Sequence, residues 1–421
     1  MFGIKPGLEA TAELLHRVGN PERELGFIHI AGTNGKGSTG AMLECMLRGA
    51  GFTTGFYSSP HLIDIRERFR VNGMAVSDED YLALSAELAF AARAESDTGK
   101  SHTFTYFEFT TVLAAMIFAR AGVDIVIWET GMGGRLDATN VVRPIASVIT
   151  GIALDHQAHL GNTLSEIAQE KAGIIKPEIP VFIGEMPQEV HSLIVEQAHK
   201  LNCQYYDLSP EIAGEVAHRT LNGRTVQEFE YNDRKITLPL IGGMQRRNFR
   251  LAAKVIEQLA PKLGIDIDLA FDALPHCRWP GRCQQVNERL IVDGGHNPDG
   301  AEALSEALLE TFPNEKITVI FAGFKDKDIR GNLQIFSKIA AEFVFVPLRE
   351  SDRPSYNGLE LVELAKSSGV TLKCSATPDL ASALKEAYAG SERKVLVAGS
   401  LYLAGDALKA TVDPFGVLNL V

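Results

Sequence analysis

The stretch Phe27-Ile-His-Ile-Ala-Gly-Thr-Asn-Gly-Lys-Gly-Ser-Thr39 decides how this sequence folds. A short apolar run ends in a glycine-rich loop that carries one lysine, and an amphipathic helical pattern follows the loop. In such a strand–loop–helix unit the backbone N–H groups and the positive end of the helix dipole converge, which suits a polyphosphate. Glycine lets the backbone approach the phosphates, and Lys36 adds a mobile positive charge. The stretch therefore predicts a site for ATP or a similar nucleotide.

This loop differs from the standard P-loop pattern. The pattern G-x-x-x-x-G-K-[ST] would need glycine at Ile30 and a hydroxyl group at Gly37. An ordinary glycine-rich turn is the alternative interpretation, but a strand before the loop and a helix after it favour the phosphate site. The loop residues expected to bind ATP are Thr33, Asn34, Gly35, Lys36, Gly37 and Ser38.

Length, charge and cysteine content narrow the class of protein. A chain of 421 residues predicts two or three domains, and 45% apolar with 22% charged residues is typical of a globular protein in solution. The net charge of -12 argues against nonspecific nucleic-acid binding. No apolar run is long enough for a membrane span, and no signal peptide is recognised. Five scattered cysteines fit reduced thiols in a cytoplasm.

The pattern of strands and helices predicts an α/β protein with two domains. Apolar strand-like runs alternate with helical stretches at Phe27–Ala31, Thr53–Tyr57, Val123–Trp128, Ala146–Thr150 and Val181–Gly184. After a connector at Pro275–Arg282 the alternation restarts at Leu290–Asp293, Ile317–Ala322, Phe343–Val346 and Lys394–Ala398. We expect a P-loop-type, mostly parallel sheet in residues 1–278, with a β-hairpin at its edge within residues 203–241. A smaller Rossmann-like α/β domain is expected in residues 284–421.

Several polar side chains follow the strands of the first domain. Glu129 ends the Val123–Trp128 strand, before glycine-rich chain, and a carboxylate there suits Mg²⁺ beside a phosphate loop. Ser59 follows another strand and is either a weak magnesium ligand or part of a serine–proline turn. His156 is a metal ligand, a base or a hydrogen-bonded loop residue. Lys171 lies in a helix that begins with a capping box at Thr163, where a solvated lysine is the equal alternative.

In the second domain, Asp293 ends a predicted strand, and His296 follows three residues later. Asn297 and Pro298 are suited to the N-cap and first turn of the next helix. No partner for a metal site is evident, so ribose or substrate contacts are favoured over metal binding. A plain βα loop is the alternative.

These segments together resemble the folylpolyglutamate synthase / dihydrofolate synthase family of the Mur ligase superfamily. The resemblance covers nearly the whole chain. It is carried by ordered blocks that include Ser58–Leu62, Thr105–Glu108, Glu129–Arg135, Leu154–His156, Glu170–Lys176, Pro280–Arg282 and Asp293–Pro298. It implies that Ser59, Glu129 and His156 hold magnesium, and that Lys171 is carbamylated and helps to hold a second magnesium.

The same resemblance implies further contacts. Asn248, Arg282 and Asp293, with His296 in the same block, would contact ATP. The loops that would bind the pterin are Lys5, Pro6, Gly7 and Leu8 together with Thr105, Tyr106, Phe107 and Glu108. Lys36, His156 and Lys171 would take part in catalysis.

The implied activity is ATP-dependent addition of L-glutamate to dihydropteroate, to tetrahydrofolate or to both, through an acyl phosphate. A folylpolyglutamate synthase alone, or another Mur-type amino-acid ligase, is the alternative. A P-loop switch protein would need a base-reading Asn-Lys-x-Asp block, which the sequence lacks. A small-molecule kinase would not need the second domain. The expected partners are small molecules, without nucleic acid or membrane, and the expected state is a monomer.

Overall fold

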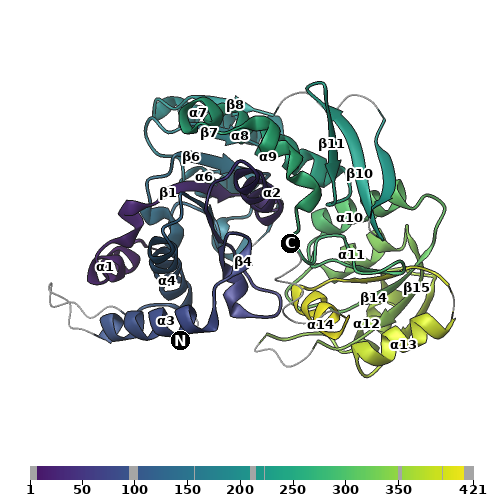
Figure 1. Ribbon diagram of the computed structural model, residues 1–421. Coiled ribbons are helices and arrows are strands. Elements are labelled where there is room, and N and C mark those ends of the chain that lie inside the picture. Colours follow the sequence, from purple (N-terminus) through teal and green to yellow (C-terminus); the bar gives the residue numbers. More distant parts are fainter. Residues whose placement is uncertain are drawn as a thin grey trace. The chain divides into compact units, whose positions relative to one another are not determined.

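The computed structural model describes residues 7–93, 103–155, 157–208, 215–221, 223–348, 353–390 and 392–411 (Figure 1). The chain divides into two compact units. The first contains Met1–Glu211 and Arg247–Leu274, and the second contains Ile212–Arg246 and Pro275–Val421. In the described residues, no helix combines the length and the apolar character that crossing a membrane requires.

An eight-stranded sheet forms the centre of the first unit, in the order β4-β3-β2-β5-β1-β6-β7-β8. Its strands are β1 (Gly26–Ala31), β2 (Thr54–Tyr57), β3 (Phe69–Val71), β4 (Met74–Ala75), β5 (Ile125–Glu129), β6 (Ala146–Ile149), β7 (Val181–Ile183) and β8 (Tyr205–Asp207). The six strands from β2 to β8 in this order are parallel, whereas β3 and β4 pair antiparallel at one edge. The parallel sheet predicted for this part of the chain is confirmed.

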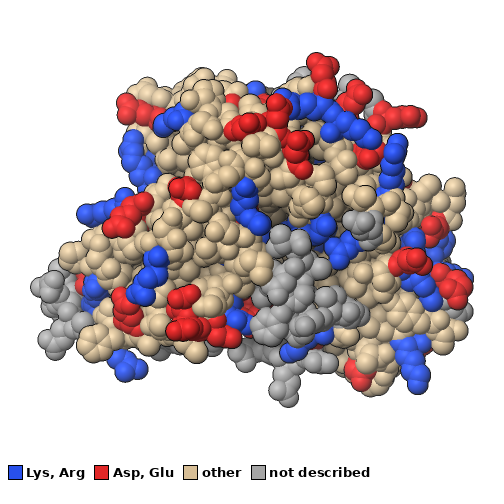
Figure 2. All heavy atoms as spheres, in the orientation of Figure 1, with Lys and Arg blue, Asp and Glu red and all other residues tan. Residues whose placement is uncertain are grey.

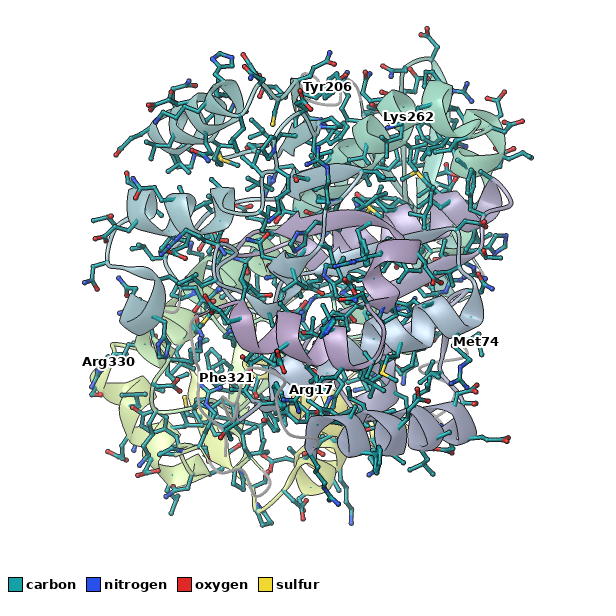
Figure 3. All side chains as sticks on the ribbon, turned by 90° about the vertical axis from the view of Figure 1, so that its left-hand side faces the viewer. Arg17, Met74, Tyr206, Lys262, Phe321 and Arg330 are labelled. Atoms are coloured by element: carbon teal, nitrogen blue, oxygen red, sulfur yellow. The ribbon has the colours of Figure 1, made fainter. Side chains whose placement is uncertain are left out.

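Helices cover both faces of this sheet. They are α1 (Glu9–Arg17), α2 (Lys36–Gly49), α3 (Asp78–Arg93), α4 (Tyr106–Ala121), α5 (Gln157–Leu160), α6 (Leu164–Ala172), α7 (Gln188–Lys200), α8 (Gly243–Leu263) and α9 (Ile267–Asp272). The boundary between the units falls inside α8. Arg17 at the end of α1, labelled in Figure 3, donates to the carbonyl groups of Ala91 and Ala92 in α3.

The alternation of side chains along the central strands explains the packing of the helices. Tyr57 and Trp128 belong to one buried cluster with apolar residues of α1, α3 and α4. Phe56 and Ile127 point to the opposite face, where they lie close to Gly40 of α2. A Cβ atom at Gly40 would come within 3.1 Å of Ile127, so glycine lets this helix approach the sheet. Successive residues of a strand face opposite sides, so both faces of the strands are buried.

The second unit contains two sheets. An antiparallel sheet consists of β9 (Ala217–Leu221), β10 (Arg224–Tyr231) and β11 (Arg234–Leu238). The other has the order β12-β13-β17-β14-β15-β16 and is parallel except for β12. Its strands are β12 (Gln284–Gln285), β13 (Leu290–Val292), β14 (Ile317–Phe321), β15 (Ala340–Phe345), β16 (Lys373–Ala376) and β17 (Val395–Ala398).

The helices of the second unit follow the strands in regular alternation. They are α10 (Pro298–Thr311), α11 (Ile329–Phe336), α12 (Gly358–Ser367), α13 (Leu380–Gly390) and α14 (Leu401–Thr411). Phe321, labelled in Figure 3, is fully buried in the core of this unit. Asn297 caps α10 and Pro298 is its first residue, as predicted. The Rossmann-like alternation expected near the C-terminus is therefore confirmed.

The hairpin expected at the edge of the first domain is placed differently. Its strands, β10 and β11, belong to the second compact unit together with a third strand, β9. Gln285 of β12 accepts hydrogen bonds from the backbone and the hydroxyl group of Thr225 in β10, which joins this sheet to the chain after Pro275. The expectation failed because these partners are far apart in the sequence.

Acidic and basic side chains of the described residues are interspersed on the face that Figure 2 shows. Many of them form ion pairs between exposed groups, such as Arg120 with Glu87 at 3.2 Å. Exposed pairs of this kind contribute little to stability.

Candidate active site

The predicted site residues of the first unit meet where the parallel strands end. In the sheet register Ile30 of β1 lies beside Glu129 of β5, and Tyr57 of β2 lies beside Trp128 of β5. The glycine-rich loop after β1, the carboxylate of Glu129 and the chain leading to Ser59 therefore leave the same edge of the sheet. Ligands of parallel α/β sheets bind at this edge.

The loop between β1 and α2 has a backbone that only glycine adopts readily. Gly35 has a φ of +86°, and a Cβ atom there would overlap the carboxamide of Asn248 in α8. A Cβ atom at Gly32 would overlap the hydroxyl group of Thr150. That hydroxyl group donates to the carbonyl oxygen of Asn34 at 2.7 Å. Residues from other segments, Thr150 among them, thus fix the conformation of the loop. The expected ATP contact Asn248 lies directly beside it.

Hydrogen bonds to the chain after β6 fix the start of the loop. The N–H group of Thr33 donates to the carbonyl oxygen of Gly151 at 2.7 Å. Its hydroxyl group donates to the carbonyl oxygen of Ala153 and accepts from the N–H group of the same residue, both at 3.1 Å. The hydroxyl group of Thr33 therefore has both a donor and an acceptor within the protein, and it does not require a ligand.

Lys36, the first residue of α2, points back over the loop. Its ammonium group donates to the carbonyl oxygens of Gly32 at 3.0 Å and Thr33 at 3.4 Å. It also lies 3.9 Å from a carboxylate oxygen of Glu129, whose residue is only 4% exposed. A positive and a negative side chain thus meet at the position where phosphates and a divalent cation would bind.

Lys171 reaches the same loop from α6. Its ammonium group donates to the carbonyl oxygen of Gly32 at 2.8 Å, and the residue is 3% exposed. Burial, together with repulsion from Lys36, lowers the pKa of Lys171 to about 7, although Asp155 and Asp137 oppose this shift. The alternative of a solvated helix lysine is therefore wrong. The capping box predicted at the start of α6, between Thr163 and Glu166, is present.

The chain after Glu129 is shaped by close contacts. A Cβ atom at Gly131 would overlap the ring of Phe107, and one at Gly134 would lie 2.7 Å from the carbonyl oxygen of Glu170. Asp137 accepts hydrogen bonds from the N–H groups of Met132 and Thr139, at 2.8 and 3.0 Å, and so closes the loop. Burial raises the pKa of Asp137, although these hydrogen bonds oppose the shift.

The block Thr105–Glu108 forms the start of α4. Thr105 is the N-cap, and its hydroxyl group and the Glu108 carboxylate form a capping box. Phe107 lies 6.0 Å from Tyr57, between ring centroids, and its ring covers Gly131. Tyr106 is 41% exposed. Glu108 is thus used by the helix, whereas the Phe107 ring lies against Gly131, two residues after Glu129, and the Tyr106 ring lies 5.5 Å from the Arg68 guanidinium group.

The chain from Ser58 to Arg68 is a loop held by its own side chains. The Glu67 carboxylate accepts hydrogen bonds from the N–H groups of Leu62, Ile63 and Asp64 at 2.7 to 2.8 Å. Arg68 donates through Nε to Nδ1 of His61 at 3.0 Å. Burial and the Arg68 charge lower the pKa of His61 to about 4, so the imidazole is a neutral acceptor. Sequence patterns alone did not identify Arg68 or Asp137.

The nucleotide contacts expected in the second unit lie around the end of β13. Asp293 accepts hydrogen bonds from the N–H groups of Cys283 at 2.7 Å and Gly295 at 2.6 Å. Burial raises its pKa, whereas Arg282 opposes the shift. The carbonyl oxygen of His296 accepts from the side chain of Asn332 at 3.4 Å. Arg282, Asp293 and His296 thus belong to one region of this unit.

Three predicted site residues, Lys5, Pro6 and His156, lie outside the described residues. Gly7 and Leu8 are described, and Leu8 is the N-cap residue of α1. Their role in pterin binding stays a prediction.

Two protein-family models match this chain, one in each half. Residues 30–256 match the Mur ligase middle domain, and residues 281–401 match the glutamate ligase domain of Mur ligases. The dihydrofolate synthase/folylpolyglutamate synthase of Bacillus subtilis is 36% identical over 420 residues, which cover 97% of this chain and 95% of that protein. The enzyme of the same name from Escherichia coli is 34% identical over 354 residues, with 82% and 78% covered.

Solved structures agree with this similarity. Mycobacterium tuberculosis folylpolyglutamate synthase complexed with ADP and AMPPCP has a TM-score of 0.85 at 28% identity, covering 96% of this chain and 95% of that one. E. coli FolC in complex with DHPP and ADP has a TM-score of 0.80 at 30% identity, covering 97% and 93%. The chain therefore belongs to the folylpolyglutamate synthase/dihydrofolate synthase family of Mur ligases.

Proposed function

We propose that this protein joins L-glutamate to dihydropteroate and to tetrahydrofolate, with hydrolysis of ATP to ADP and phosphate. It would act as a monomer in the cytoplasm, on small molecules only. The observation that carries the proposal is the meeting of Lys36, Glu129 and Lys171 around one nucleotide loop, in a chain that belongs to this family.

The chemistry follows from the poor reactivity of a carboxylate toward an amine. An oxygen of the acceptor carboxylate attacks the γ-phosphorus of ATP, the bond to the β-phosphate oxygen breaks, and an acyl phosphate and ADP result. The amine of L-glutamate then attacks the acyl carbon, loses a proton, and phosphate leaves. Lys36 and the N–H groups at the start of α2 stabilise the negative charge on the phosphates. Asn248 supports the loop at Gly35.

The donor atoms of the first unit fit Mg²⁺. In the part of the chain that the structure describes, no three His, Cys, Asp or Glu side chains form a metal cluster. Mg²⁺ does not need one, because it is usually held by one or two carboxylates, with substrate phosphates and water completing six oxygen ligands. Glu129 and the hydroxyl group of Ser59 would hold it, with His156 proposed as a further ligand. The ion would neutralise charge on the transferred phosphate.

The environment of Lys171 fits carbamylation. A buried amine with a pKa of about 7 is partly neutral under physiological conditions. A neutral amine can add carbon dioxide, forming an N–C bond and losing a proton, which replaces a cation by an anion. That anion would help to hold a second Mg²⁺. The carbamate nitrogen keeps one N–H group, so its hydrogen bond to Gly32 can persist.

The proposed contacts with the other substrates are divided between the units. In the first unit, Lys5–Leu8 and Thr105–Glu108 would bind the pterin. In the second, Arg282, Asp293 and His296 would contact ATP.

ADP release by the purified protein, with ATP, Mg²⁺ and L-glutamate, tests the proposal with each acceptor separately. Turnover with both acceptors supports it. Turnover with tetrahydrofolate alone would reduce the activity to that of a folylpolyglutamate synthase. ATP hydrolysis that does not depend on glutamate, or no turnover with either acceptor, would contradict the proposal and favour another Mur-type amino-acid ligase.

A further inference from the structure

Three arginines alternate along one short stretch, and one of them differs from the others. Arg66 forms ion pairs with Asp64 at 2.9 Å and Asp78 at 3.0 Å. Arg70 forms an ion pair with Glu44 at 2.6 Å. Arg68 has no carboxylate within 4.0 Å among the residues that the structure describes, although it is only 8% exposed. A nearly buried cation without an anion is costly unless a ligand supplies one.

Arg68 is held so that one end of its side chain stays available. Its Nε group donates to His61, and its guanidinium carbon lies 5.5 Å from the ring centroid of Tyr106. Its backbone carbonyl accepts from the N–H group of Ser58 at 3.2 Å. The two terminal nitrogens donate to no described residue. The planar group is therefore fixed by an imidazole and an aromatic ring, while its forked end has no acceptor among the residues that the structure describes.

A fixed guanidinium fork is suited to a carboxylate, because two parallel N–H groups match two carboxylate oxygens. The acceptors of the proposed reaction differ in this respect. Dihydropteroate has one carboxylate, and that carboxylate reacts. Tetrahydrofolate has two, of which the γ-carboxylate reacts and the α-carboxylate remains.

The place of Arg68 in the first unit indicates which carboxylate it binds. The reacting carboxylate must lie at the γ-phosphate, beside Lys36 and the glycine-rich loop. Arg68 instead lies against Tyr106 at the start of α4, next to Phe107, whose ring covers Gly131. Thr105–Glu108 is the block proposed for the acceptor, and among the described residues Arg68 forms no hydrogen bond or ion pair with the glycine-rich loop, Lys36 or Glu129.

We infer that Arg68 binds the non-reacting α-carboxylate of a folate-type acceptor and thereby distinguishes tetrahydrofolate from dihydropteroate. This inference rests on the proposed function. Arg68 would act on acceptor affinity, and the transfer of the phosphoryl group would not require it.

The test begins with the wild-type protein, whose turnover with each acceptor decides the proposed function independently of Arg68. Arg68→Met is then compared with wild type for both acceptors, with ATP and L-glutamate saturating. The KM for tetrahydrofolate is expected to rise about 10- to 100-fold, because a charged, two-bonded contact is lost. The KM for dihydropteroate is expected to stay within about threefold, which also shows that the variant folds.

A binding measurement separates affinity from catalysis. Calorimetry would compare tetrahydrofolate with an analogue in which the α-carboxylate is an amide. Wild type should bind the analogue about 10- to 100-fold more weakly, whereas Arg68→Met should bind both ligands equally. The protein change and the ligand change would then be non-additive, as expected for two partners in direct contact.

Arg66→Met is the matched control, because it removes the same charge two residues away, from an arginine that already has carboxylate partners. It should not alter the preference between acceptors. Equal losses with both acceptors in Arg68→Met would overturn the inference and assign Arg68 to a step that they share. A raised KM for L-glutamate alone, or an unchanged KM for tetrahydrofolate, would also overturn it.

Discussion

The ammonium group of Lys171 donates a 2.8 Å hydrogen bond to the carbonyl oxygen of Gly32, although the two residues are 139 positions apart. Lys36 donates to the same carbonyl oxygen at 3.0 Å. One backbone oxygen at the start of the nucleotide loop thus accepts from two lysines. Helix α6 is thereby tied to the loop, and a change of charge on Lys171 acts directly on the atoms that precede Lys36.

Gly35→Ala is expected to impair nucleotide binding. The φ of +86° is unfavourable for alanine by about 1 to 2 kcal/mol, and the new Cβ atom would overlap the Asn248 carboxamide. The KM for ATP should rise at least about tenfold. Gly51→Ala is the control, because Gly51 has a φ of +89° but open space around it. It should lower stability by a similar amount while leaving the KM for ATP unchanged.

Glu129→Gln is expected to weaken the binding of Mg²⁺. The amide keeps the shape of the side chain but removes the charge that attracts the cation. The concentration of free Mg²⁺ at half-maximal ADP release should rise about tenfold or more, and the maximal rate should fall. Glu87→Gln, which changes an exposed carboxylate paired with Arg120, should behave as wild type. Identical Mg²⁺ curves for both variants would exclude Glu129 as a ligand.

Gly131→Ala is expected to act on the acceptor through Phe107. A Cβ atom at Gly131 would overlap the Phe107 ring, which must then move. The KM for both acceptors should rise several-fold, about 2 to 3 kcal/mol of stability should be lost, and the KM for ATP should hardly change. Combining it with Phe107→Leu should restore part of the lost stability, measured by urea unfolding, because the smaller side chain gives way. Additive losses in the double variant would show that the two residues do not interact.

His29 is expected to make the fold sensitive to acid. The residue is fully buried, its Nε2 atom lies 3.0 Å from the Thr139 hydroxyl group, and burial lowers its pKa from 6.5 to about 3. Between these values the unfolded chain binds a proton that the folded chain does not. The free energy of unfolding therefore falls as the pH decreases through this window, by about 1.4 kcal/mol per pH unit from this group.

His29→Leu removes the titrating group, so its stability should depend less on pH within the same window. Urea unfolding at about pH 7, 6, 5 and 4 would measure the two slopes. Parallel curves for wild type and His29→Leu would show that other groups cause the loss of stability in acid.

The sequence predicted those elements whose signals are local. Strands such as β1 and β5 are mostly apolar, almost entirely buried runs, and the Thr163 and Asn297 caps are determined by neighbouring residues. The short strands β3 and β16 lack a continuous apolar run and were not predicted. The exposed strand β9 was also missed, which left its sheet as a hairpin assigned to the first domain.

The site was predicted in part for the same reason. The loop glycines and Glu129 stand out because they directly follow recognisable strands. The burial of Lys171 and the packing of Asn248 on Gly35 depend on contacts between distant segments, which a local pattern does not contain. Arg68 was missed because it lies in the same alternating run as Arg66 and Arg70, and what distinguishes it in the structure is the lack of a carboxylate partner among the described residues.

That difference among the arginines has a consequence for how this chain can evolve. Arg68 is withdrawn from water and has no anion beside it among the described residues, which destabilises the fold without ligand. Random substitution under selection for heat resistance alone should therefore replace Arg68 sooner than Arg66. Selection for growth on folate-type acceptors should keep it. In mutational libraries selected under the two conditions, the frequency of arginine at position 68 should therefore differ. Such a comparison would reveal which residues are retained for function rather than for stability.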